Sequence, residues 1–210
     1  MYSMNLLNYL FNFVIITSKL FDIDESHALK HSMDVYYFSN KIYESELVNN
    51  TFLNNHKNII DTSAILHDMC DKKYMDEKIG LDRISNYMKS KISDNELDIS
   101  LKIISTMSYS TIKKNGYPQL NEYQLAYNIV READLLASYD FDRCIMYQML
   151  KNNDNYQDSF INAKIIFENR VFKYNDDKLF LTDYSINLSN KLHRSALKRI
   201  NNLSKIHKIQ

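Results

Sequence analysis

The chain has 210 residues, with 26 basic and 26 acidic side chains, two Gly, one Pro and two Cys. Gly80 and Gly116 stand too far apart to build a glycine-rich phosphate loop, and so few Gly and Pro residues disfavour turn-rich sandwiches and barrels. The formal net charge of zero argues against nucleic acid as the main partner, because neutralising phosphates requires an excess of Lys and Arg. We therefore expect an all-α fold, and the lack of a composition break predicts a single domain over residues 1–210.

The first apolar segment, MYSMNLLNYLFNFVIITSKLF, is a candidate for a signal or membrane segment and fails both tests. Asn5, Asn8 and Asn12 interrupt it, and no Lys or Arg precedes it. Its apolar residues repeat at helical spacing, which predicts an amphipathic first helix. We therefore expect no membrane partner and a cytoplasmic location, where Cys70 and Cys144 stay reduced. The composition is rich in Asn, Ile, Lys and Tyr, which is typical of an AT-rich genome such as that of a parasite, phage or large virus; for a virus, the location would be the host cytoplasm.

The rest of the chain predicts further helices in close succession. Asp24 or Ser26 can cap a second helix that runs to about residue 46. Later helical patterns cover about 58–70, 76–91, 95–108, 121–150, 158–174 and 183–206. Polar breaks such as residues 151–158 separate them.

Chemically versatile side chains gather in three of these segments. His27 and His31 are four residues apart, which on a helix places both imidazoles on one face. The dipeptide His67-Asp68 ends the apolar stretch IIDTSAILHD, and Asp134 lies in READLLASYDFDR. Each of the three is a weak signal alone, because short motifs of this kind also arise by chance.

Taken in order, the three segments resemble the H…HD…D pattern of the HD-domain metal-dependent phosphohydrolase superfamily, and in particular its single-domain, YedJ-like branch. The blocks that carry the resemblance are SHALKHSMDV, SAILHDMCDKK, IISTMSYS and EADLL, followed by the tail AKIIFENRVFKYNDDKLFLTDYSINLSNKLHRSALK. The similarity runs from about residue 26 to residue 203. It implies a helical bundle of the HD type, with a metal-site core at about 26–145 and C-terminal helices at about 158–206 that pack back on it.

The resemblance also implies a set of metal ligands. These are His31, His67, Asp68 and Asp134. Imidazole and carboxylate donors suit divalent ions such as Mn, Mg, Fe, Co or Ni, and four protein ligands leave positions open for water and a phosphate oxygen. Without the resemblance, His67 would be read as a hydrogen-bonded core residue and Asp134 as a buried acid paired with Arg131 or Arg143. His27 is expected to contact the ligands or the substrate rather than the metal.

Other candidates surround this set. Asp68 is a candidate catalytic residue as well as a ligand, and Asp71 could orient or deprotonate the attacking water, although a plain loop acid is the alternative. Lys72 or Lys73 could hold a substrate phosphate, and we favour Lys72.

Two more residues complete the candidate substrate contacts. Arg194 could bind phosphate through bidentate hydrogen bonds from its guanidinium, and Ser108 could contribute a hydroxyl to substrate binding. The chain departs from the family pattern at Ala28, where an Asp is usual, and at residues 136–140, where LASYD replaces L-D-A-x-G. These changes affect substrate preference more than metal binding. Asp140, Asp142 and Arg143 are predicted to continue one helix, by default as an ion-pair network.

The function that the resemblance implies is hydrolysis of a small phosphorylated metabolite, with nucleotides favoured, by a metal-activated water. The alternative is a non-catalytic HD-fold protein that binds a nucleotide or a partner and uses the metal as a structural pin. Hydrolysis of a cyclic dinucleotide or a guanosine alarmone is a third possibility, and the oligomeric state stays open.

Overall fold

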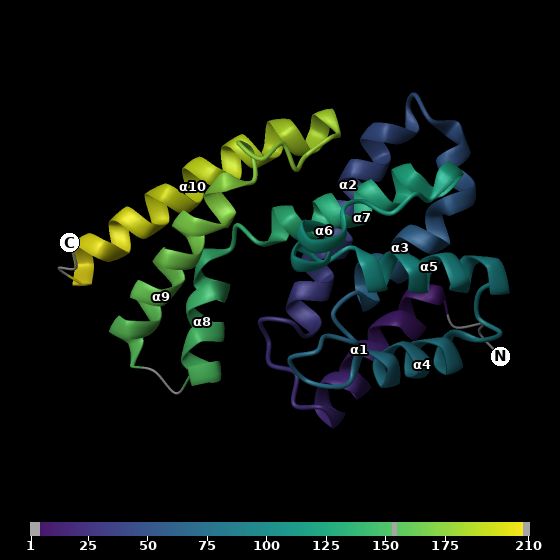
Figure 1. The fold of residues 1–210 in the computed structure, drawn as a ribbon, viewed down its shortest axis with the longest axis horizontal. Coiled ribbons are helices and arrows are strands. Elements are labelled where there is room, and N and C mark those ends of the chain that lie inside the picture. Colours follow the sequence, from purple (N-terminus) through teal and green to yellow (C-terminus); the bar gives the residue numbers. More distant parts are fainter. Residues whose placement is uncertain (1–4, 153–154, 208–210) are drawn as a thin grey trace. The chain divides into compact units, whose positions relative to one another are not determined.

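The computed structural model describes residues 5–152 and 155–207, so the expected break at 151–158 lies partly outside them (Figure 1). Throughout these residues the elements are helical, and the β-type contact is an isolated bridge between Lys89 and Ile92. The α-helices are α1 (Leu6–Leu20), α2 (Leu29–Leu47), α3 (Lys57–Leu66), α4 (Glu77–Met88), α5 (Asp94–Thr106), α6 (Tyr109–Asn115), α7 (Gln124–Ala137), α8 (Phe141–Asn152), α9 (Tyr156–Asn169) and α10 (Asp183–His207). Short 3-10 segments are η1 (Thr51–His56), η2 (Asn121–Tyr123) and η3 (Val171–Lys173). The all-α prediction is confirmed.

The contacts divide the chain into two compact units, Met1–Ala133 and Asp134–Gln210. The boundary falls inside α7, which carries Asp134 as the first residue of the second unit. The two units are described separately below. The expectation of a single domain stays a prediction.

Helix α3 is the central element of the first unit, because α1, α2 and α5 all pack against it. Its side chains from Ile59 to Leu66 are buried without a break. A helix that is covered all round delivers its last residues into the interior, and the His67-Asp68 dipeptide follows directly. The core around the end of α3 is formed by Leu10, Phe13 and Val14 of α1, Ile84 and Met88 of α4, and Leu97 and Ile104 of α5.

Helices α4 and α5 begin at side-chain caps. Asp76 accepts hydrogen bonds from the backbone N–H groups of Lys78 and Ile79 at the start of α4. Ser93 and Glu96 form a reciprocal capping box at the start of α5. The short helix α6, which the sequence analysis did not predict, begins at Ser108 in the same way. These caps fix where each helix starts around the buried end of α3.

Gly80 on α4 lies directly against the turn that follows His67 and Asp68. A Cβ atom at position 80 would lie 2.5 Å from Cys70 Cβ and 2.6 Å from Cys70 Cα. Because the second of these atoms belongs to the backbone, the clash cannot be relieved by rotating a side chain. Only Gly allows α4 to pack at this distance.

Gly80→Ala is therefore expected to destabilise the protein by about 1–3 kcal/mol through overpacking, which outweighs the gain of roughly 0.5–1 kcal/mol in helix propensity. Chemical denaturation of the full chain measures the difference. Asn86→Ala, at an exposed position of the same helix, is the matched control and should raise stability by at most about 0.7 kcal/mol through helix propensity. A Gly80→Ala protein that is more stable than the wild type would contradict the close contact.

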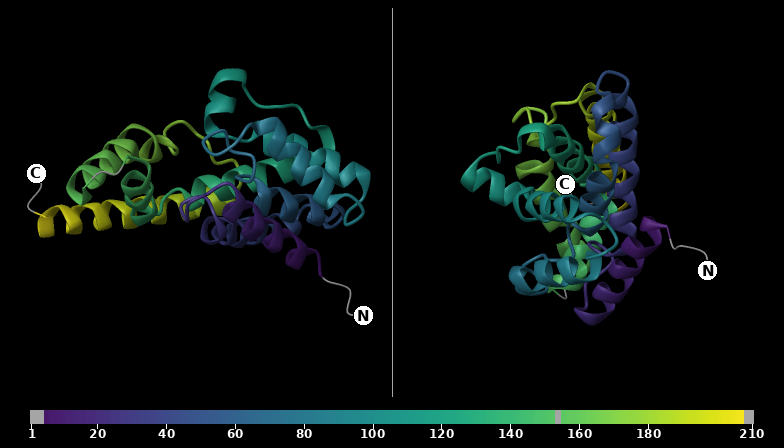
Figure 2. Two further views of the ribbon diagram at one scale, coloured as in Figure 1. Left: turned by 90° about the horizontal axis from the view of Figure 1, so that it is seen from below. Right: turned by 90° about the vertical axis from the view of Figure 1, so that its right-hand side faces the viewer.

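The second unit is built from α8, α9 and α10, where α8 packs against both α9 and α10. Figure 2 shows α10 as one long helix without a break. Phe141 lies edge-on to Phe160 and Phe167, with ring centroids 5.5 and 5.1 Å apart, and this aromatic group fills the space between α8 and α9. No helix among the residues described here combines the length and the apolar character needed to cross a bilayer.

The prediction of one continuous helix over residues 121–150 was wrong. The helical pattern stops at Ala137 and resumes at Phe141. Asp140 Oδ1 accepts a hydrogen bond from the backbone N–H of Arg143 at 3.1 Å, so this carboxylate caps a new helix and does not continue the old one. Asp142 pairs with Arg199 of α10 through two guanidinium hydrogen bonds of 2.9 and 2.8 Å. The pair is half-exposed on both sides and adds little stability.

Candidate metal centre

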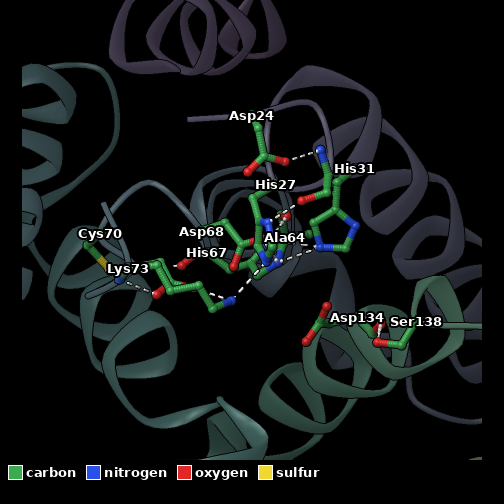
Figure 3. Close-up of polar contacts among 12 residues, drawn as sticks. Asp24, His27, His31, Ala64, His67, Asp68, Cys70, Lys73, Asp134 and Ser138 are labelled. Atoms are coloured by element: carbon green, nitrogen blue, oxygen red, sulfur yellow. Dashed lines mark hydrogen bonds and ion pairs between the residues drawn. The ribbon is translucent and has the colours of Figure 1, made fainter. Parts of the chain in front are cut away.

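Two imidazoles and a carboxylate converge at the end of α3 (Figure 3). His31 lies in the first turn of α2 and is 1% exposed. His67 is the residue at which α3 ends, and Asp68 follows in the next turn. Buried imidazoles and carboxylates are costly unless they bind something, so their presence together marks a site.

The distances among these groups are short. His31 Nε2 lies 3.1 Å from His67 Nε2, and Asp68 Oδ2 lies 3.3 Å from the first nitrogen and 3.4 Å from the second. A second group includes Asp134 of α7. Its three potential ligand atoms, one each from His31, His67 and Asp134, lie within 4.8 Å of one another. Of the four ligands that the resemblance implied, His31, His67 and Asp134 form a group that could hold a metal ion, and Asp68 lies beside the two histidines.

The geometry fits a divalent ion. Two donor atoms bound at about 2.1 Å to one metal lie roughly 3.0–3.4 Å apart for ligand angles between 90° and tetrahedral. The distances of 3.1, 3.3 and 3.4 Å fall in that range. Asp68 Oδ2 is also a buried oxygen that accepts no hydrogen bond among the residues described, and ligation would satisfy it.

The tautomer of His67 is set by the backbone. His67 Nδ1 lies 2.9 Å from the carbonyl oxygen of Ala64, and a carbonyl oxygen can only accept, so Nδ1 carries the proton and donates it. In the neutral imidazole, Nε2 then presents its lone pair toward His31 and Asp68. This is the orientation in which a metal-binding histidine is held by a backbone carbonyl.

The electrostatic surroundings keep Asp68 ionised. Burial alone would raise the pKa of its carboxyl group, but positive charge on the His67 ring, when that ring is protonated, holds the pKa well below its usual range. Asp68 is therefore a carboxylate when the neighbouring imidazoles are protonated, and a divalent ion would supply the same positive charge.

His27 occupies a different place from the one that its spacing predicted. The first turn after Asp24 is not helical, because Asp24 Oδ1 accepts the backbone N–H of Ser26 at 2.8 Å and α2 begins only at Leu29. His27 therefore precedes the helix, and the prediction that it shares a helix face with His31 was wrong. The His27 ring still lies near the centre, 6.2 Å from the His31 ring between centroids.

The loop after Asp68 contains the candidates for catalysis and phosphate binding. Asp71 is half-buried, accepts the backbone N–H of Lys73 at 2.9 Å, and has Oδ2 3.1 Å from Lys73 Nζ. Lys72 points elsewhere, since its side chain is 73% exposed and its ammonium pairs with Glu77 at 2.9 Å. The structure thus brings Lys73, and not the favoured Lys72, into contact with the residues around the centre.

The two remaining candidates have local roles in the structure. Ser108 is exposed, and its hydroxyl accepts the backbone N–H of Thr111 as the cap of α6. Arg194 is exposed on α10 in the second unit, where its Nε donates to the backbone oxygen of Asn190 at 3.2 Å. Contact of either residue with a substrate stays a prediction.

One side chain near the centre, Tyr74, was missed at the level of sequence. The Tyr74 hydroxyl donates to Asp24 Oδ2 at 2.5 Å and lies 3.1 Å from His27 Nδ1. The only cue for Tyr74 is its position just after the HD segment, and no spacing rule connects residues 24 and 74.

Comparison with known proteins gives the fold and no family. No protein-family model matches the chain, and no curated protein matches it in sequence. Among solved structures, the chain is similar to a protein of Lactobacillus plantarum, with a TM-score of 0.72 and 15% identity over 100% of both chains. It is also similar to Bacillus subtilis YpgQ, with a TM-score of 0.61 and 17% identity over 96% of this chain and 97% of YpgQ. At these identities the likeness shows a shared all-helical fold alone.

Proposed function

We propose that the chain is a metal-dependent phosphohydrolase of the HD type that acts on a small phosphorylated metabolite, with nucleotides as the first candidates. The observation that carries the proposal is the 3.1–3.4 Å triangle formed by His31 Nε2, His67 Nε2 and Asp68 Oδ2, with Asp134 contributing the fourth donor. This donor set of nitrogen and oxygen atoms suits Mn, Mg, Fe, Co or Ni. The order of the ligands along the chain is that of the superfamily that the sequence resembles.

Each residue has a role in the proposed reaction. His31, His67, Asp68 and Asp134 would hold the divalent ion, which supplies positive charge to the phosphate and acidifies water. Asp71, three residues after Asp68 and half-buried, would orient the attacking water and take its proton. The Ala64 carbonyl fixes the tautomer of His67 before any substrate arrives.

A reconstitution experiment tests the proposal. The purified full chain is stripped of metal with a chelator and reloaded separately with Mn²⁺, Mg²⁺, Fe²⁺, Co²⁺ or Ni²⁺. Release of phosphate and of pyrophosphate is then measured over nucleoside mono-, di- and triphosphates and simple sugar phosphates. We expect release with at least one ion and none from the stripped protein. A protein that binds stoichiometric metal yet releases neither product would instead be a non-catalytic binding protein with a structural ion.

A further inference from the structure

Two side chains next to the candidate metal centre hold the ammonium group of Lys73. Its Nζ donates to His27 Nε2 at 2.9 Å and lies 3.1 Å from Asp71 Oδ2. Figure 3 shows the lysine extending toward the imidazole group. A free lysine loses much rotamer entropy when it is fixed, so an ammonium already anchored here can receive an anion at lower cost.

In the hydrogen bonds that connect Lys73 to Asp24, each residue donates to the next one in the series. An ammonium can only donate, so His27 Nε2 accepts and the proton of the neutral ring is on Nδ1. That Nδ1 lies 2.6 Å from Ser26 Oγ and 3.1 Å from the Tyr74 hydroxyl, which in turn donates to Asp24 Oδ2. This series of hydrogen bonds therefore connects the Lys73 ammonium, through His27 and Tyr74, to the Asp24 carboxylate.

Asp24, the last residue of this hydrogen-bonded series, is ionised. Burial would raise the pKa of Asp24, but hydrogen bonds from Ser26 and Tyr74 hold its pKa below the ordinary value. An ionised Asp24 orients the Tyr74 hydroxyl, and through it the His27 ring. The arrangement keeps His27 Nε2 turned toward Lys73.

We infer that Lys73, and not Lys72, binds a phosphate group of the substrate, and that His27 and Tyr74 are positioning residues that hold its ammonium beside the metal centre. The inference rests on the proposed function, because it takes the anion to be a phosphate that also meets the metal. A compact, strongly hydrated ammonium is a suitable point charge for a phosphate oxygen.

Asp71 makes this binding depend on the metal. Its carboxylate lies 3.1 Å from the ammonium and offsets part of its charge. Lys73 alone therefore attracts phosphate weakly, and the ion supplies the rest of the attraction. Phosphate should bind well only when both the lysine and the divalent ion are present.

Calorimetric titration of the full-length, Mn²⁺-loaded protein with inorganic phosphate tests the role of Lys73. Lys73→Met should weaken phosphate binding by about 10- to 100-fold, the usual effect of losing a hydrogen bond to a charged group, while Mn²⁺ stoichiometry stays unchanged. Lys73→Arg keeps the charge and should retain part of the affinity. Lys78→Met, at an exposed position of α4, is the matched control and should bind phosphate as the wild type does.

The positioning role of Tyr74 has its own readout. Tyr74→Phe removes only the hydroxyl and should weaken phosphate binding by about 3- to 10-fold, the range of a single neutral hydrogen bond. In a Lys73→Met background the same change should have no further effect, because Tyr74 acts through the lysine. A loss of equal size in both backgrounds would overturn the positioning role.

Three other results would overturn the inference. They are absence of phosphate binding to the Mn²⁺-loaded wild type, normal binding by Lys73→Met, and a loss in Lys72→Met as large as that in Lys73→Met. Failure of the proposed function gives a different pattern, since phosphate binding would depend on Lys73 although no substrate is hydrolysed. Phosphate release that is unaffected by Lys73→Met would overturn the inference and leave the proposed function standing.

Discussion

Replacing His67 or Asp68 by Ala is expected to lower the affinity for divalent metal by at least about 100-fold, because even residues that only support a ligand contribute roughly 10- to 100-fold. Both side chains are part of the 3.1–3.4 Å triangle, so neither loss can be compensated by a neighbour. Metal analysis of the dialysed proteins and a titration with Mn²⁺ measure the effect. Activity should disappear together with the metal.

The same substitutions should reduce the stabilisation that metal gives. A ligand present at 100 times its dissociation constant stabilises the folded state by about 2.7 kcal/mol. For a chain of this length that corresponds to roughly 5–10 °C in Tm. The quantity to compare is the increase in Tm on adding metal, because the substitutions also change the metal-free protein. Asp82→Ala, at an exposed position of α4, is the control and should keep the full increase. Full metal occupancy in both His67→Ala and Asp68→Ala would refute the assignment.

Asp71→Asn is expected to lower kcat by roughly 10²–10⁴-fold, the range typical of losing a general base. The amide keeps the shape of the side chain, and its oxygen can still accept the backbone N–H of Lys73. It removes the negative charge and the capacity to take a proton. Metal content and the free energy of unfolding should therefore stay close to those of the wild type.

Steady-state kinetics on the best substrate from the phosphate-release screen checks this prediction. Asp82→Asn makes the same chemical change at an exposed position and should leave kcat unchanged. If Asp71→Asn turns over at the wild-type rate, Asp71 is an ordinary loop acid that pairs with Lys73.

The sequence analysis was most successful where the information is local. His67 and Asp68 could be found because they end the apolar stretch IIDTSAILHD, and the burial of α3 places that stretch at the centre of its unit. The helix-forming pattern itself was also sufficient to predict an all-α fold. Local patterns of this kind predict the fold well because the apolar residues that mark a helix in the sequence are the same residues that become buried.

The errors arose where short polar side chains compete with the helix. Asp24 accepts the N–H of Ser26 in a turn instead of capping α2, and Asp140 starts a new helix where periodicity predicted a continuous one. Asp and Ser can satisfy the backbone in either way, and the choice depends on the surrounding packing. The contact between Tyr74 and Asp24 joins residues 50 positions apart, so no local pattern could reveal it.

The close contact between Gly80 and Cys70 bears on how long an ion held at the candidate centre would stay in place. Cys70 follows Asp68 by two residues, so the turn that carries the ligand has α4 directly against it. Native proteins open locally in cooperative units, and a turn packed this tightly cannot open unless the covering helix moves away. The escape rate of such an ion would then depend partly on the local unfolding of α4, a helix outside the set of proposed ligands.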